Sequence, residues 1–470
     1  MLSDVSLRVS NAKAEAELGW QPAFRVLPGG TGSGVTRGLR QDARVPRPRL
    51  LADLTPLKVS SAYRRMWLGG FLSGIGTHLT TVAVGLQVYD LTGSTFSVGL
   101  VGLFAVVPLV TLGLYGGSIV DAHDRRRVII TSSSGLLLVA AGFATQAWLE
   151  LGNVALLYAL VAVQNGFFAV NSPARGSIIP RLLPLYLLPA ANALWSMSVF
   201  VGASVGPLTA GLLIGGWGYG AAYSVEVVML GVALTTLVAL PPLPPEGEVR
   251  RAGLASVLEG LRFLGTRPNV RMTFLVDLAA MVLAMPRVLL PAIGVSFIGG
   301  DATTVGILVA AIGVGSFLGG VFSGPLGHVH RQGLAVLVSV VVWGTAITAF
   351  GLVVALAPEP SSDGFAHGTL WPAAACLVLA GGADAVSAVF RTTILQTATP
   401  DAMRGRLQGV FIVVVAGGPR LGDLVLGAVA GVVVEPVTAI AGGLACVVVV
   451  IALALAQPAF ARYDAREPAP

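Results

Sequence analysis

Long apolar runs, each the length of a membrane-spanning helix, alternate with short polar loops along most of the chain. A helix needs about 20 mostly apolar residues to cross a hydrocarbon core of about 30 Å. Twelve segments meet this requirement: 67–89, 96–120, 128–148, 154–174, 190–215, 221–242, 270–297, 302–326, 333–357, 370–391, 407–432 and 434–457. The pattern therefore predicts an all-α membrane protein with twelve transmembrane helices.

A longer polar interruption follows the sixth segment. Residues 243–269 begin LPPEGEVRR and then place apolar side chains at helical spacing, at Leu254, Val257, Leu258, Leu261 and Leu264. We expect a cytoplasmic linker with one amphipathic helix. It would separate two six-helix bundles, 51–242 and 270–457, with 458–470 as a cytoplasmic tail.

Composition supports a membrane protein and argues against nucleic-acid binding. Hydrophobic residues make up 55% of the 470, charged residues 11%, and the mean hydropathy is +0.82, whereas soluble domains have about 25% charged residues. The net charge of +6 belongs to residues 1–65, which hold eleven of the 29 Lys and Arg and five of the 23 Asp and Glu. The remainder is neutral. Both cysteines, Cys376 and Cys446, lie in apolar segments and are interpreted as small core residues.

The placement of Lys and Arg predicts the orientation of the helices. Residues 121–127 carry five charges in seven positions, and cytoplasmic loops are enriched in Lys and Arg. With this loop in the cytoplasm, the loops on the other side contain no Lys or Arg. We therefore expect a multi-pass protein of the cell membrane (inner or plasma membrane), surrounded by the lipid bilayer, monomeric, with both termini cytoplasmic.

The charged loop between the second and third segments carries a spaced motif. Four residues have the spacing G-x-x-x-D-x-x-x-R-R: Gly117, Asp121, Arg125 and Arg126. This motif resembles the signature between helices 2 and 3 of the major facilitator superfamily, which implies a cytoplasmic latch between two bundles. Asp124 stands where that signature has a glycine, and it becomes a further latch residue. Alternatively, the charges only keep this loop in the cytoplasm.

Other stretches resemble one subgroup of that superfamily. They are GLQVYDLTGS (85–94), EGLRFLGTRP (259–268), MPRVLLPAIG (285–294) and ILQTATPDAMRGRLQGV (394–410). The similarity is to enterobactin exporters, transmembrane secretion effectors and macrolide efflux proteins, and it implies the major facilitator fold. After the eighth segment, GPLGHVHR (324–331) is a weak copy of the first loop, as expected for two related bundles.

Ionisable residues inside the segments are candidates for the transport site, since each costs about 2.5–3.5 kcal/mol at a helix centre. These are Asp277, Arg287, Asp384, Arg420 and Asp423, with Glu226 interpreted as an interface residue near a helix end. Arg420 and Asp423 share a helix face. They either neutralise each other, or Asp423 carries a proton while Arg420 binds an anionic substrate. Arg391 lies seven residues after Asp384, about 10 Å along a helix, so we expect no direct contact. Asp384 is then either a candidate for protonation or a structural residue that forms a bond with a neighbouring helix.

The resemblance also implies a central cavity lined by helices 1, 4, 7 and 10. Arg287 and Asp384 should then face this cavity. Arg287 follows Pro286, where a kink in the helix can redirect the arginine side chain. Arg287 and Asp423 match the enterobactin-exporter pattern, whereas Asp384 departs from it. Three polar residues lie in the middle of predicted segments: His78, Gln164 and Asn165. They either line a path for substrate and protons or form interhelical hydrogen bonds.

The sequence contains no metal-ligand cluster, phosphate-binding loop, nucleophile triad or nucleotide-binding domain. We therefore expect no enzyme and no cofactor. Residues 9–24 resemble the end of epimerase-class dehydrogenases, but no G-x-G-x-x-G unit precedes them, so residues 1–50 are expected to be a disordered basic tail from a fusion or an early start.

The function that fits these features is secondary active transport. We expect a proton-coupled exporter of a small amphipathic compound, a siderophore or drug, working by alternating access. The alternatives are an uptake transporter, or a receptor or regulator that retains the fold without transporting.

Overall fold

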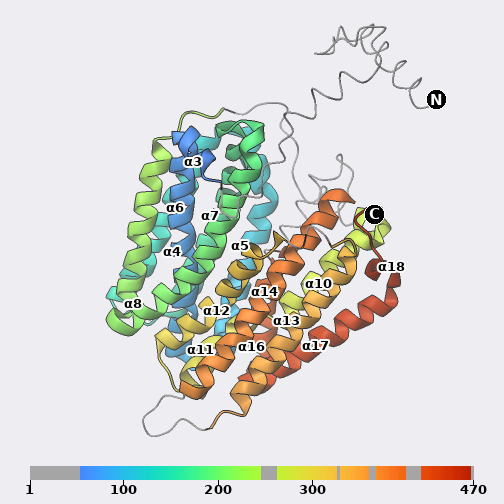
Figure 1. Cartoon of the computed structure of the whole chain (residues 1–470). Coiled ribbons are helices and arrows are strands. Elements are labelled where there is room, and N and C mark those ends of the chain that lie inside the picture. Colours follow the sequence, from blue (N-terminus) through green and yellow to red (C-terminus); the bar gives the residue numbers. More distant parts are fainter. Residues whose placement is uncertain are drawn as a thin grey trace, which may run out of the picture. The chain divides into compact units, whose positions relative to one another are not determined.

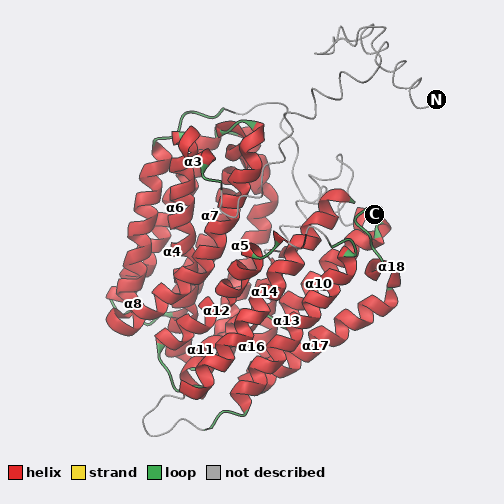
Figure 2. Cartoon of the chain, in the orientation of Figure 1, coloured by secondary structure: helices red, strands yellow, loops and turns green. Residues whose placement is uncertain are grey.

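The computed structural model describes residues 53–244, 262–324, 326, 329–358, 367–398, 414–415 and 417–466, without the side chains of 114, 116–118, 121, 185 and 367. Within these ranges the chain forms helices and loops only (Figure 2). The predicted tail, 1–50, and linker residues 245–261 lie outside the described residues. Residues 262–266 at the end of the linker are helical. The residue bounds of the bundles and linker stay a prediction.

In the described residues the first half of the chain contains five long helices, which Figure 1 shows side by side. In order they are α3 (Thr55–Val59), α4 (Ser61–Thr92), α5 (Thr95–Ala122), α6 (Arg125–Trp148), α7 (Val154–Leu182), the short η1 (Leu185–Leu187) and α8 (Leu188–Val238). Helix α8 has 51 residues and turns at Gly218, whose φ of 78° is unfavourable for any residue with a Cβ. It thereby contains the two predicted segments 190–215 and 221–242.

The second half repeats this arrangement with one broken helix. In order it contains α10 (Pro268–Leu283), η2 (Pro286–Leu289), α11 (Leu290–Ala292), η3 (Ile293–Phe297), α12 (Ala302–Val321), α13 (Gln332–Ala355), α14 (His367–Thr397), α16 (Gly417–Ala430), α17 (Glu435–Ala456) and α18 (Pro458–Ala461). Residues 268–297 act as a single span interrupted at Ala284 and Met285.

Ten helices of the described chain are long and apolar enough to cross a membrane. The bend in α8 divides one of them in two, and α16 is the described part of the predicted segment 407–432. The predicted all-α membrane fold is therefore confirmed. Local sequence sets many helix starts: the side chains of Ser94, Asn153 and Asp301 accept hydrogen bonds from the free backbone N–H groups of α5, α7 and α12.

The two halves meet along α5 with α16 and along α8 with α12. We call the end of the bundle that contains Thr95, Asp301 and Glu435 the loop end, and the opposite one, with Arg125 and Pro268, the linker end. Glycines bring the backbones together toward the loop end. A Cβ on Gly99 would lie 2.7 Å from the carbonyl oxygen of Asp423, and one on Gly306 would lie 2.7 Å from that of Pro207. Such small residues allow helices to pack closely without hydrophobic side chains between them.

Candidate functional site

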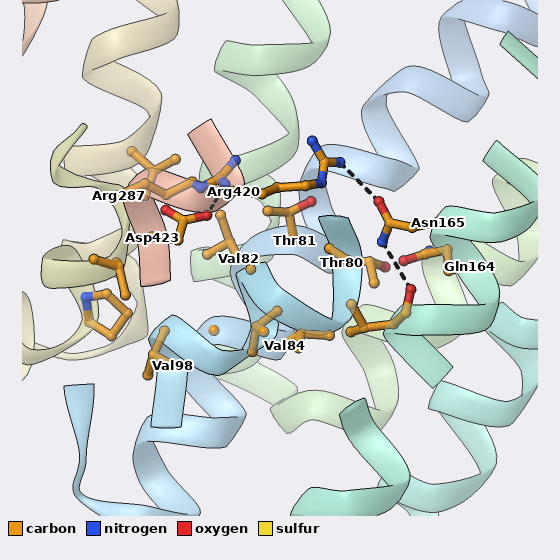
Figure 3. A pocket seen from close by; sticks show the side chains of 18 of the residues that line it. Thr80, Thr81, Val82, Val84, Val98, Gln164, Asn165, Arg287, Arg420 and Asp423 are labelled. Atoms are coloured by element: carbon orange, nitrogen blue, oxygen red, sulfur yellow. Dashed lines mark hydrogen bonds and ion pairs between the residues drawn. The ribbon is translucent and has the colours of Figure 1, made fainter. Parts of the chain in front are cut away.

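A cavity of about 100 Å³ lies between the two halves. Its walls come from α4, α5 and α7 on one side, and from η2, α11, α12 and α16 on the other (Figure 3). Valines and glycines form much of the wall. The polar lining consists of Thr80, Thr81, Gln164, Asn165, Arg287, Arg420 and Asp423. Five of the predicted site residues therefore line one cavity: Gln164, Asn165, Arg287, Arg420 and Asp423.

The break after α10 directs Arg287 toward this cavity. Helix α10 ends at Leu283, Met285 is extended, and Pro286 begins the short helix η2, as the kink predicted at this proline requires. The Arg287 guanidinium forms an ion pair with the carboxylate of Asp423 on α16. The arginine side chain is 29% exposed and the aspartate side chain 9%, so the pair lies at the cavity wall with its arginine on the open side.

Arg420 spans the two halves of the chain. Its Nη2 donates a hydrogen bond of 2.9 Å to Oδ1 of Asn165 on α7, and Nδ2 of Asn165 donates to the carbonyl oxygen of Val161 at 2.9 Å. Figure 3 shows Arg420 reaching toward Asn165, while Asp423 and Arg287 face each other. The ion pair of Asp423 is therefore formed with Arg287 on another element, although Arg420 is on the same face of α16. The spacing of Arg420 and Asp423 along α16 did not identify Arg287 as the partner of Asp423, because the break between α10 and η2 brings this second arginine to Asp423.

The charges of the cavity favour an anionic, partly apolar ligand. Two arginines and one aspartate line it, which gives one excess positive charge when all three are ionised. The amides of Gln164 and Asn165 add donors and acceptors, and the valines supply apolar surface. Guanidinium groups bind carboxylates and phenolates through charge-assisted hydrogen bonds.

A buried carboxyl group lies directly behind this wall. Glu226 on α8 is 0% exposed. The Thr80 hydroxyl donates to its Oε2, and Nε2 of Gln164 donates to its Oε1 at 3.4 Å. Sequence reasoning placed Glu226 near a helix end and left it out of the site. An acidic residue within the apolar stretch YSVEVVML was the available signal, because α8 continues through this position.

Asp277 and Asp384 belong to a second cluster in the other half. Arg391 forms ion pairs with both, and its Nη2 lies 3.3 Å from Oδ1 of Asp384. The expectation of no contact between Asp384 and Arg391 is therefore wrong. A long arginine side chain that points back toward the start of its helix covers much of the 10 Å rise. Asp277 and Arg391 line a separate cavity of about 70 Å³, together with Thr273 and Thr392.

Asp384 and His78 are not among the described residues that line the central cavity. Asp384 is held by Arg391 instead, so the expectation that it faces the same cavity as Arg287 is wrong. His78 lies on α4 against α8, where a Cβ on Gly206 would be 2.7 Å from the His78 Cβ. This contact favours a packing role for His78 in the observed conformation.

Among the described residues, the side chains of three predicted gate residues form hydrogen bonds with backbone groups of the first half and of Leu243 at the start of the linker. Asp124 caps α6 by accepting from Arg126 N at 2.8 Å, and it also accepts from Leu243 N at 3.2 Å. Arg126 donates to the Val238 carbonyl oxygen at 2.6 Å, and Arg125 donates to that of Ser177 at 3.3 Å. The side chain of Asp121, like Gly117, lies outside the described residues.

The helix α7 continues two turns beyond the predicted segment 154–174, and this places Arg175 inside it. Arg175 is buried, and its Nε donates to Oδ1 of Asn171 at 2.7 Å. Asn171 in turn donates to Ser132 and Ser133 on α6. Sequence reasoning missed this buried arginine because the predicted segment ends one residue before it.

Comparison with known proteins identifies the family. The sequence profile of the transmembrane secretion effector family matches residues 51–468. The chain belongs to this family. It is 30% identical over 427 residues to an enterobactin exporter of Citrobacter koseri, covering 90% of this chain and 98% of the relative. It is 31% identical over 421 residues to the enterobactin exporter of Shigella boydii serotype 18, covering 89% and 97%.

Solved structures with the same fold include other transporters of the major facilitator type. The nucleoside transporter NupG superposes with a TM-score of 0.64 at 14% identity, over 85% of this chain and 99% of that one. The human organic anion transporter MFSD10 gives a TM-score of 0.59 at 16% identity, over 83% and 98%. The protein is thus a multi-pass membrane transporter with the major facilitator fold, and its family consists of transporters of small molecules, not enzymes.

Proposed function

We propose that this transporter exports a small amphipathic anion, such as a siderophore or an anionic drug, by alternating access and at the expense of a proton gradient. The central observation is the cavity between the halves, where Arg287 and Arg420 face a wall of valines and amides. The enterobactin exporters, similar over about nine-tenths of the chain, support export as the direction.

Cargo would enter from the linker end, which we assign to the cytoplasm together with both termini. In the observed conformation the halves pack closely toward the loop end. The cavity between them has a volume of about 100 Å³, which is smaller than the roughly 300–1,000 Å³ of typical ligand pockets. The site must therefore widen to hold a drug-sized molecule. Rocking of the halves would provide this change, with the transporter acting as a monomer in the bilayer.

Proton coupling would act through the carboxylates that neutralise the arginines. In an exporter driven by inward proton flow, the proton and the cargo must occupy the site in different halves of the cycle. Asp423 and Asp384 would take up a proton when the site faces outside and release it when the site faces inside. Arg287 and Arg420 would bind the anionic groups of the cargo from inside, in the half of the cycle in which no proton is carried.

The charged loop at 121–127 would set when the linker end opens. We assign Gly117, Asp121, Asp124, Arg125 and Arg126 to this gate, since their motif resembles the superfamily latch. The variant Asp121→Asn should slow turnover more than it weakens cargo binding. Intact flux combined with weaker binding would contradict this division of roles.

Transport in reconstituted vesicles tests the proposal. Enterobactin and, separately, the macrolide erythromycin are offered as probes to proteoliposomes with and without an imposed pH gradient. The gradient should drive accumulation of at least one probe, and Asp423→Asn or Asp384→Asn should reduce it. Asp464→Asn is the matched control, because Asp464 lies outside the long helices and pairs with Arg466. Binding of a probe without gradient-dependent flux would contradict coupled export.

A further inference from the structure

Glu226 differs from the other acidic side chains in the interior of the helices. Asp423 is paired with Arg287, while Asp277 and Asp384 are paired with Arg391. Across the described chain, no Lys, Arg or His forms an ion pair with Glu226. Its carboxyl group is bonded by neutral donors alone, the Thr80 hydroxyl and the Gln164 amide.

The surroundings of Glu226 supply no compensating charge. From α4 it faces Gly76 and Thr80, and from α7 it faces Gln164. On its own helix the nearest titratable group is Tyr223, whose hydroxyl donates to Oε1 of Gln87 at 2.8 Å. The α6 side is apolar: Leu136 and Ala140 pack against Leu230 of α8. His78, the other titratable group on this part of α4, lies against Gly206 of α8.

A fully buried carboxylate with no cation is costly in a medium of low dielectric constant. The group is therefore suited to hold a proton while it is buried and to release it only when water or a cation reaches it. Each of the three aspartates above has an arginine partner, although Asp277 and Asp384 share one.

Thr80 and Gln164 connect this carboxyl group to the cavity. Both residues line the central cavity, whereas Glu226 is behind them and 0% exposed. The next residue after Gln164 is Asn165, which binds Arg420 at 2.9 Å. A change of charge on Glu226 thus acts on α7 at the position where that helix holds the arginine of the cavity.

We propose that Glu226 is a proton-binding site of the transport cycle, loaded and unloaded through the Thr80 hydroxyl on the cavity wall. A hydronium ion in the cavity gives its proton to the Thr80 oxygen and becomes water, and Thr80 passes its own hydrogen to Oε2 of Glu226. The carboxylate then becomes a neutral acid, and release is the reverse exchange. This inference rests on the proposed proton coupling and names the group that couples it.

The flux experiment uses Glu226→Gln, which keeps the size and polarity of the side chain but binds no proton. Glu435→Gln is the matched control, because Glu435 also accepts from a threonine of another helix, Thr95, but at the loop end. We expect Glu226→Gln to retain exchange of enterobactin between the two sides without a gradient and to lose gradient-driven accumulation. The control should retain both.

The outcomes separate the two proposals. If the wild type shows no gradient-driven flux of either probe, the proposed function fails. If the wild type is driven by the gradient and Glu226→Gln is driven equally well, only the role of Glu226 fails.

A second measurement needs no cargo and tolerates variants with low activity. Infrared difference spectra of the membrane-reconstituted protein between acidic and alkaline pH report the carbonyl stretch of protonated carboxylic acids. A band from a buried acid should be lost in Glu226→Gln, shifted in Thr80→Val and retained in Thr80→Ser, which keeps the hydroxyl. Identical spectra for wild type and Glu226→Gln would overturn the inference.

Discussion

Arg391 should be one of the most sensitive positions for stability, because a single guanidinium pairs with two carboxylates in the second half. Its side chain is 13% exposed, that of Asp277 is 6% exposed, and that of Asp384 is 34% exposed. The variant Arg391→Met keeps most of the side-chain volume and removes the charge. It leaves Asp277 ionised and buried without a cation, or forces it to bind a proton.

The magnitude follows from burial. Removing one partner of a buried ion pair costs about 3–5 kcal/mol, which applies to the contact with Asp277. The contact with Asp384 is 3.3 Å long, and the side chain of Asp384 is more exposed than that of Asp277, so this contact should contribute less than the one with Asp277. We therefore expect the loss of stability to be largest in Arg391→Met, intermediate in Asp277→Asn, where Arg391 keeps Asp384, and smallest in Asp384→Asn.

The assay is the apparent melting temperature of the purified transporter in one detergent at one heating rate, because membrane transporters often unfold irreversibly. A triple variant, Arg391→Met with Asp277→Asn and Asp384→Asn, removes every charge of the cluster. It should melt well above Arg391→Met alone, since no unpaired charge remains. If the triple variant melts below Arg391→Met, lost packing and not unpaired charge explains the effect, and the reasoning is refuted.

Three further variants test separate parts of the structure. Gly99→Ala should destabilise the transporter by about 1–3 kcal/mol through overpacking against Asp423, whereas Gly74→Ala, with open space around it, should not lower the melting temperature. Asp124→Ala should lower the free energy of unfolding by about 1 kcal/mol, because the α6 cap is lost. Asp124→Asn should retain most of the stability, because asparagine can also cap a helix. Equal melting temperatures of the two variants would contradict the capping role. Arg420→Met should weaken equilibrium binding of enterobactin about tenfold, or about 1.4 kcal/mol, while the exposed Arg462→Met should bind like the wild type.

The apolar runs alone were sufficient to predict the transmembrane helices, whereas the major facilitator arrangement was implied by the resemblance of the motif at 117–126. Each segment long enough to span a bilayer forms a helix in the described part of the chain, because backbone groups in lipid must be bonded within the helix. Helix ends were less predictable. The predicted segment 154–174 ends before Arg175, where a charged residue ends the apolar run, yet α7 continues past it and buries it with Asn171.

The cavity residues were predictable for a similar reason. A charge or amide in mid-span survives only against protein or water, and Arg287, Arg420, Asp423, Gln164 and Asn165 all line one cavity. Their pairing was not predictable, because it depends on how the helices are rotated and broken. The break at Pro286 gives Asp423 its arginine, and the length of the Arg391 side chain gives Asp384 a partner that spacing along the helix had excluded.

The distribution of ion pairs also bears on how the halves can move. Every ion pair between helices in the described chain lies within the second half, where Arg287 binds Asp423 and Arg391 binds Asp277. Contacts between the halves near the loop end are of another kind. They consist of close backbone packing at glycines and of hydrogen bonds such as Tyr89 to Ser296 at 2.9 Å and Thr95 to Glu435 at 2.6 Å.

Separating the halves at the loop end therefore breaks no ion pair among the described residues. Interhelical hydrogen bonds in membranes average about 0.6 kcal/mol each, whereas breaking a buried ion pair costs about 3–5 kcal/mol. The strong electrostatic contacts thus hold the second half together as a unit, and the weak ones lie where alternating access requires the halves to part. The polar contact between halves at the cavity, Arg420 to Asn165, joins a charge to a neutral amide, so parting α16 from α7 at this contact leaves no carboxylate of α7 without its partner.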